Sequence, residues 1–182
     1  MQNTISTIYL NSKNDDCAFQ LENCISNMLK ENLPWDSVVI VCIGSDRSTG
    51  DSLGPLVGYK LKKYNLKQTH IYGTLENPIH AGNIETELSL IYQKHAGSFV
   101  IAIDASLGKK EHLGFVTLSP SPLKPGLGVK KELPPVGDAH ITGIVNLSGS
   151  METLLLQTTR LSNVMRMADT ISKALMYSLS EI

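Results

Sequence analysis

Hydrophobic and polar positions alternate along the chain in blocks that predict strands and helices in turn. Short apolar or β-branched runs, such as "VVIVCI" before Gly44, are typical of strands covered on both faces of a sheet. These runs predict strands over 37–44, 69–75, 98–105, 114–120 and 140–149. Apolar residues at helical spacing predict helices over 16–31, 54–64, 83–95 and 151–179. The alternation predicts an α/β fold, a three-layer sandwich whose mostly parallel sheet has about five strands.

Composition describes an ordinary globular protein. The 182 residues are enough for a single domain with a sizeable core, and 42% of them are hydrophobic. A formal net charge of -1 gives no sign of a nucleic-acid partner, and no apolar run is long enough to span a membrane. Residues 121–138 hold four of the eight prolines and are typical of a long loop. The first residues lack the basic start and apolar stretch of a secretory signal, so we expect a cytoplasmic protein.

Two aspartates stand where an α/β sheet places its ligands, beyond the carboxyl ends of the strands. Asp51 lies in the loop "GSDRSTGDSLGP" after the first apolar run, and Asp104 ends the run "FVIAIDA". Two carboxylates brought close cannot both ionise easily, so one keeps a proton near neutral pH. Such a pair can act as general base towards water and general acid towards a leaving group. It could also ligate a divalent metal, the one cofactor that these residues suggest.

The glycine- and hydroxyl-rich loop has two other interpretations. It resembles an anion nest at a helix N-terminus, although it lacks the GxxxxGK[ST] and GxGxxG patterns, and Asp46 and Asp51 would repel a phosphate. Asp51 could also cap the helix that follows it. These interpretations leave a mononucleotide site or a purely structural loop as alternatives.

Further candidate residues come from the same loop and from later segments. In the loop, Gly44, Ser45 and Gly50 would shape the backbone and offer N–H groups to an oxyanion, and Ser52 joins them as a loop residue. His80 follows the second strand and can border the crevice, whereas His140 precedes the last strand and reaches the site only if the preceding loop folds back. Ser106 lacks the GxSxG surroundings of a nucleophile, which argues against a serine hydrolase.

Several long stretches resemble the YyaC-type sporulation proteins. They are "IGSDRSTGDSLGP", "AIDASLG", "GTLENPIHAGNIE", "GLGVKKELPPVGDAHITGIVNLSG" and "LLLQTTRLSNVMRMADTI". The resemblance runs from about 35 to 171. It therefore divides the single domain into an N-terminal extension with a helix, 1–34, and a family core, 35–182.

The YyaC-type family is in turn similar to two peptidase groups with a phosphorylase/hydrolase-like fold, the spore germination protease and the hydrogenase maturation endopeptidases. The first group has "TPDALGP" and "AIDAL", which match "TGDSLGP" at Asp51 and "AIDAS" at Asp104. In the second group the acidic pair and a His bind the nickel of the substrate protein, and the nearest counterpart of that His is His140. The resemblance implies a two-aspartate peptidase centre, with Asp51, Asp104 and His140 as metal candidates. His140 departs from the family pattern because it precedes a strand, not a helix.

The function expected from the sequence is therefore an endopeptidase of a sporulating bacterium, acting in sporulation or germination in the forespore or mother cell. Its partner would be a protein or peptide substrate, with small acid-soluble spore proteins as candidates, and no nucleic acid or membrane; a homo-oligomer is left open. The alternative is a non-catalytic sporulation protein of the same fold that binds a partner protein, a metal or a mononucleotide.

Overall fold

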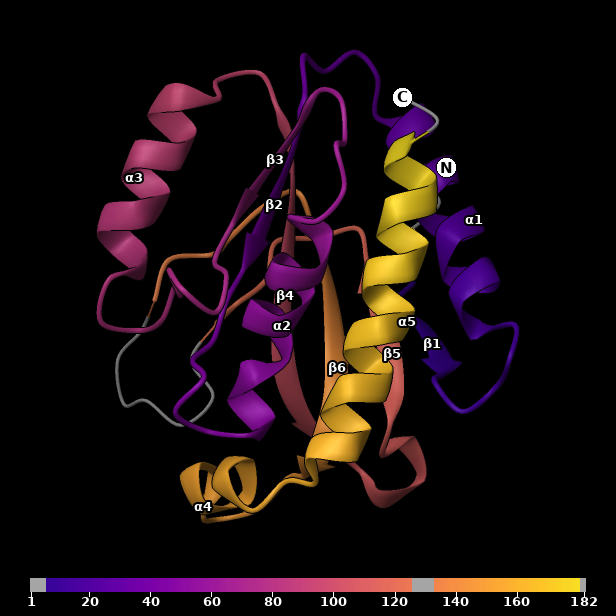
Figure 1. Cartoon of the computed structure of the whole chain (residues 1–182), viewed down its shortest axis with the longest axis vertical. Helices are drawn as coiled ribbons and strands as arrows, with labels where there is room; N and C mark the ends of the chain where they lie inside the picture. Colours follow the sequence, from indigo (N-terminus) through magenta and orange to yellow (C-terminus); the bar gives the residue numbers. More distant parts are fainter. Residues whose placement is uncertain (1–5, 126–132, 181–182) are drawn as a thin grey trace.

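The computed structural model describes residues 6–125 and 133–180, and Figure 1 shows its elements in chain order. Its strands are β1 (Ile8–Asn11), β2 (Val38–Cys42), β3 (Thr69–Tyr72), β4 (Phe99–Gly108), β5 (Phe115–Ser119) and β6 (Ala139–Leu147). They form one sheet in the order β1-β5-β6-β4-β2-β3. β2, β3, β4 and β6 run parallel, whereas β5 is antiparallel to both of its neighbours. The prediction of a mostly parallel sheet is confirmed.

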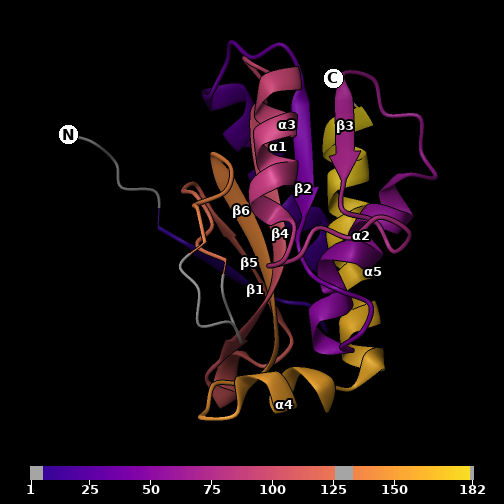
Figure 2. The same cartoon turned by 90° about the vertical axis from the view of Figure 1, so that its left-hand side faces the viewer.

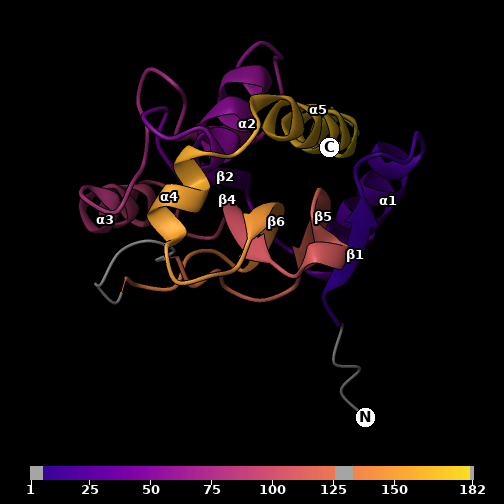
Figure 3. The ribbon, with the colours of Figure 1, turned by 90° about the horizontal axis from the view of Figure 1, so that it is seen from below.

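Helices cover both faces of this sheet, as predicted. They are α1 (Cys17–Glu31), α2 (Leu53–Leu61), α3 (Ile84–Lys94), α4 (Glu152–Gln157) and α5 (Leu161–Ser180). The apolar sides of α1, α2 and α5 share one buried cluster with the sheet, and α3 shares a second cluster with the opposite face. Figure 2 looks at the molecule from the side of α3, which lies in front of the strands. α4 lies beyond the carboxyl end of β6, where it crosses the view from below in Figure 3.

The continuous apolar run in β2 follows from this layering. Val38, Ile40 and Cys42 pack in the cluster of α2 and α5, whereas Val39 and Val41 pack in the cluster of α3. All five side chains are buried. A strand covered on both faces must be apolar at every position, which is the pattern that the sequence shows.

The sheet has one strand more than the five predicted. β1 is only four residues long, pairs with β5 at the edge of the sheet, and has Tyr9 exposed. The predicted helix over 151–179 is also interrupted between α4 and α5. The hydroxyls of Thr158 and Thr159 donate to the carbonyls of Leu154 and Leu155, both at 2.8 Å, and such back-bonding competes with continuation of a helix.

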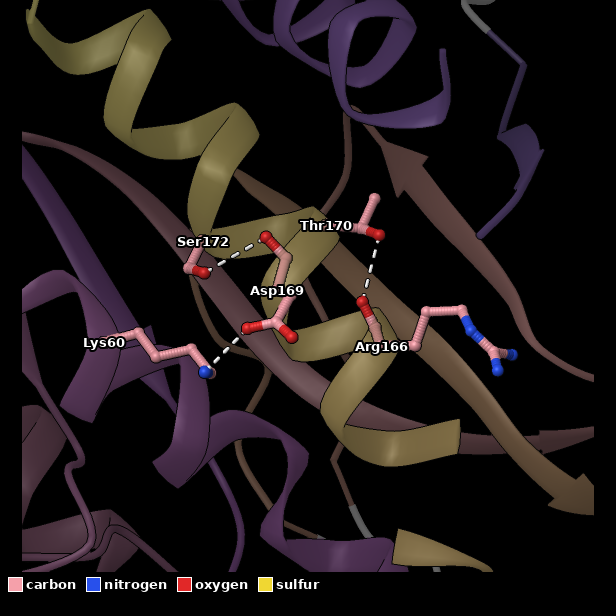
Figure 4. A network of polar contacts seen from close by, with 5 residues as sticks. All are labelled: Lys60, Arg166, Asp169, Thr170 and Ser172. Carbon is pink, nitrogen blue, oxygen red and sulfur yellow. Dashed lines mark hydrogen bonds and ion pairs between the residues drawn. The ribbon is translucent and has the colours of Figure 1, made fainter. Parts of the chain in front are cut away.

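The contact between α2 and α5 is mostly apolar, with one ion pair at its rim. Lys60 Nζ lies 2.6 Å from Asp169 Oδ1, and Asp169 is largely exposed (Figure 4). An exposed pair of this kind contributes about 0–1 kcal/mol, so packing holds the two helices together. Of the part of the chain that the structure describes, no helix combines the length and apolarity needed to cross a bilayer.

Candidate active site

The loop after β2 turns back on itself at Gly44. Gly44 has φ +136°, and a Cβ atom there would lie 2.0 Å from the carbonyl oxygen of Asp51. The Ser45 N–H donates to that same carbonyl at 3.1 Å, and the Gly44 N–H donates to the Ile79 carbonyl at 2.8 Å. The hydrogen bond to Ile79 ties the loop to the segment after β3. The close approach of Gly44 to the Asp51 carbonyl closes the loop, and only glycine permits it.

Asp51 lies in a single 3₁₀ turn, Gly50–Ser52, directly before α2. The N-cap of α2 is Ser52, not Asp51, and its side chain makes no capping hydrogen bond. The interpretation of Asp51 as the helix cap is therefore wrong. The absence of a side chain at Gly50 lets α4 approach this turn, since a Cβ atom there would lie 2.9 Å from the Leu156 carbonyl oxygen and from Thr159 Oγ1.

Asp104 comes from β4, at the point where the neighbouring strand β2 has just ended. The last residue of β2, Cys42, is in register with Ile103, whereas on the other side Asp104 is in register with Thr142 of β6. β4 does not end at 105, as the sequence predicts, but continues to Gly108 along β6. Asp104 is 7% exposed, and its Oδ1 accepts the N–H of Ala105 at 2.7 Å.

The two aspartates influence one another electrostatically. Burial raises the pKa of Asp104 well above its ordinary value, and the charge of Asp51 raises this pKa further, against a lowering by the Ala105 N–H. Burial also raises the pKa of Asp51, whereas the Ser45 N–H and the charge of His80 lower it. These opposing influences favour a pair in which Asp104 keeps its proton and Asp51 is the ionised partner.

His80 is the histidine that the structure brings to this pair. Its backbone N–H donates to Asn83 Oδ1 at 2.8 Å, and its Nδ1 accepts the Gly82 N–H at 3.1 Å. A nitrogen that accepts carries no proton, so in the neutral ring the proton is on Nε2. His80 is exposed, which leaves its ring accessible from solvent.

His140 has a different position. It is the second residue of β6, in register with Ala102, and is therefore two residues before Thr142, the register partner of Asp104. Two residues span about 7 Å along a strand. Its Nδ1 lies 2.7 Å from the carbonyl oxygen of Ser121 and is the donor of that hydrogen bond.

The donor set does not form a metal site of its own. Among residues 6–125 and 133–180, no three His, Cys, Asp or Glu side chains are grouped so that they could hold a metal ion. The set Asp51, Asp104 and His140 therefore does not fit a resident metal. The two carboxylates can still contribute oxygen ligands to a metal that a substrate protein carries.

Two expectations for the loop require correction. The N–H groups of Gly44 and Ser45 already donate to the carbonyls of Ile79 and Asp51, so neither is available to an oxyanion or a phosphate. The anion nest loses its first two donors for the same reason. Of the other loop residues, Asp46 is exposed, and Ser45 Oγ accepts the Arg47 N–H at 3.2 Å.

Hydroxyl groups on β4, β5 and β6 form a cluster next to Asp104. It includes Ser106, a candidate from the sequence, together with Thr142 and Thr117, which the sequence did not indicate. Ser106 Oγ donates to Thr142 Oγ1 at 3.2 Å and to the Gly143 carbonyl at 3.3 Å, and Thr142 Oγ1 lies 2.7 Å from Thr117 Oγ1. The Ser48 Oγ in the Asp51 loop is buried without a partner. Threonine and serine are common in strands and loops, so the sequence carries no signal for these roles.

Residues 9–174 match the profile of a family described as "Protein of unknown function (DUF1256)". The chain belongs to this family. A DUF1256-type relative, "Uncharacterized protein YyaC" of Bacillus subtilis (strain 168), is 48% identical over 167 residues, which span 92% of this chain and 81% of the relative. The family match starts at residue 9, so it includes most of β1 and all of α1, which the sequence motifs place outside the family core.

The DUF1256 chain also has a structural neighbour. It superposes on the crystal structure of a [NiFe] hydrogenase maturation protease HycI from Thermococcus kodakarensis KOD1 with a TM-score of 0.56 and 16% sequence identity. The superposition covers 86% of this chain and 98% of the neighbour. At that identity the likeness establishes the three-layer fold, and chemistry has to be argued from the site.

Proposed function

We propose that this protein is a peptidase that hydrolyses peptide bonds at the Asp51–Asp104 pair. The observation that carries the proposal is that burial and the charge of Asp51 both raise the pKa of Asp104. A neutral carboxylic acid beside an ionised one supplies acid and base in the same crevice. The fold shared with HycI, a [NiFe] hydrogenase maturation protease, supports hydrolysis as the reaction class.

The two carboxyl groups divide the work in the proposed mechanism. Asp51 takes a proton from a water molecule, whose oxygen attacks the peptide carbonyl carbon, while Asp104 gives its proton to the carbonyl oxygen. In the second step the C–N bond breaks: Asp51 gives its proton to the departing nitrogen, and a hydroxyl of the intermediate returns a proton to Asp104. One water is consumed, and both carboxyl groups end as they began.

His80 supports this assignment of roles. When its ring is protonated, the charge of His80 lowers the pKa of Asp51 and so opposes the rise in this pKa that burial causes. In the neutral ring, the Nε2–H can donate a hydrogen bond to the substrate carbonyl oxygen, in place of the N–H groups of Gly44 and Ser45, which are already bonded. His80 therefore acts as an electrostatic and positioning residue in the mechanism.

The substrate proposed is an unfolded or exposed segment of a protein, in a cell that forms spores. The family resemblance and the relative from Bacillus subtilis support this setting, and small acid-soluble spore proteins are the first candidates. The site itself favours a peptide over a nucleotide, because the loop presents carboxylates and its first N–H groups are occupied.

The proposal is tested by incubating the full-length protein with small acid-soluble spore proteins and with β-casein, and by identifying products by mass spectrometry. We expect cleavage by the wild type and a loss of at least about 10³-fold for Asp51→Asn and Asp104→Asn. Asp46→Asn, an exposed change in the same loop, is the control and should cleave normally. Cleavage that persists in both single variants, or binding of these proteins without any cleavage, contradicts the proposal.

A further inference from the structure

The strand β3 ends the sheet on one side, so its outer edge is free to pair. It bonds only to β2 in the sheet order. The Val38 N–H donates to the Gln68 carbonyl at 2.8 Å, which fixes the ladder: residues 68, 70 and 72 face β2. The N–H and C=O groups of Thr69 and Ile71 therefore point outward. The strand contains no proline and no Lys, Asp or Glu that would block an added strand.

A cavity of about 510 Å³ lies at the carboxyl end of this strand. Its walls are Ile71 and Tyr72 of β3, the loop from Gly73 to His80, Lys62 after α2, and Glu87 of α3. The volume lies within the range of sites that bind ligands in proteins. In Figure 2, which faces this side of the molecule, β2 is drawn between α3 and β3.

The cavity adjoins the loop that carries Asp51, through His80 and Ile79. His80 lines it and also lowers the pKa of Asp51 by its charge. The cavity wall at Ile79 forms a parallel bridge with Ile43, and the Ile79 carbonyl accepts the Gly44 N–H at the base of the Asp51 loop. A chain that follows the β3 edge past His80 therefore arrives at the loop that carries Asp51.

We infer that the outer edge of β3 binds an extended segment of a protein substrate as a seventh strand and directs it past His80 to the Asp51–Asp104 pair. Delivery of the bound segment to the Asp51–Asp104 pair rests on the proposed function, whereas its pairing with β3 does not. The outward N–H and C=O groups match a peptide main chain, which is how edge strands recognise peptides. The cavity walls carry both Lys62 and the acidic Glu76 and Glu87, so its charge does not suit a polyanion.

Hydrogen exchange tests the pairing without relying on catalysis. The probe is β-casein, a natively unfolded protein, added at saturation to full-length Asp104→Asn, and exchange is read residue by residue by NMR. We expect the amides of Thr69 and Ile71 to exchange at least 10-fold more slowly with β-casein present, and those of His70 and Tyr72, already bonded to β2, to change little. Unaltered exchange at both outward amides overturns the inference.

Two proline substitutions test the pairing of the substrate with β3 in the active protein. Ile71→Pro removes an outward N–H and keeps the β2–β3 hydrogen bonds, but it also removes the partly buried Ile71 side chain, which Ile71→Ala removes alone. We expect Ile71→Pro to have a KM for β-casein about 10-fold higher than that of Ile71→Ala, with kcat little changed. Tyr9→Pro is the matched control on the opposite edge, because the Ser12 N–H donates to Gly114 in the β1–β5 pairing and Tyr9 then points outward. Equal KM values in Ile71→Pro and Ile71→Ala overturn the inference while leaving the peptidase in place. Slowed exchange in a protein that cleaves nothing would refute the peptidase and keep the peptide-binding edge.

Discussion

The α-carbon of Gly44 lies so close to the carbonyl of Asp51 that an added Cβ atom would stand 2.0 Å from its oxygen. This contact closes the loop that carries Asp51, and the Ser45 N–H donates to the same carbonyl. The glycine at the end of β2 is thus a condition for the position of the catalytic candidate seven residues later.

The first prediction concerns this contact. Gly44→Ala should destabilise the fold by on the order of 3 kcal/mol, because the alanine must leave φ +136° or displace Asp51. Urea denaturation measures the change. Gly149→Ala is the control: it meets only the Leu155 methyl, at 3.3 Å, and should change stability by less than about 0.5 kcal/mol. Equal effects of the two substitutions would show that the close approach is not restrictive.

The second prediction is that the buried Asp104 lowers the stability of the fold at neutral pH. Burial holds the pKa of Asp104 above its unfolded value, so the folded state binds more protons and stability falls as pH rises through the interval between the two values. Asp104→Asn should therefore stabilise the protein at pH 7 by on the order of 1 kcal/mol, or about 2–4 °C in Tm, and the gain should vanish below about pH 4.

Thermal unfolding at several pH values checks this second prediction, with Asp15→Asn as an exposed control. A variant that is less stable than the wild type at pH 7, or a difference that does not depend on pH, would contradict the raised pKa of Asp104.

The third prediction assigns the acid limb of the activity profile. His80 lowers the pKa of Asp51 by its charge, so His80→Gln should raise that pKa and move the acid limb of kcat/KM to higher pH. His140→Gln should leave the acid limb in place, because His140, on β6, is hydrogen-bonded to the carbonyl of Ser121. No shift in His80→Gln would contradict the role given to His80. A shift in His140→Gln alone would give that role to His140.

The fold was largely predictable because buried parallel strands appear in the sequence as continuous apolar runs. β1 was not, since four residues at an edge with Tyr9 exposed leave no periodic signal. The position of Asp51 followed from the end of β2. Asp104 lies within β4, which continues to Gly108, and it lies just past the level at which the neighbouring strand β2 ends. The partnership of Asp51 with His80 depends on the path of the loop after β3, and the place of His140 depends on the register of β6 against β4, neither of which a single sequence encodes in its periodicity.

The fourth prediction concerns α4. Asn146 Nδ2 donates to the Leu155 carbonyl at 2.7 Å and holds α4 against β6, behind the turn at Gly50. Asn146→Ala should cost about 1–2 kcal/mol, speed exchange of the α4 amides and lower kcat. Thr170→Ala, which removes a helix-surface hydroxyl on α5 (Figure 4), is the control and should leave α4 unchanged. Unchanged exchange in Asn146→Ala would show that α4 is held by other contacts.

The most direct test of the account is a pH titration of the side-chain carboxyl carbons of Asp51 and Asp104 by ¹³C NMR. The account predicts that Asp104 titrates well above the ordinary carboxyl pKa of about 3.9, and that its midpoint falls in Asp51→Asn because the neighbouring charge is gone. Two carboxyl groups that each titrate near 3.9, with midpoints that do not respond to one another, would contradict a shared proton and the mechanism built on it.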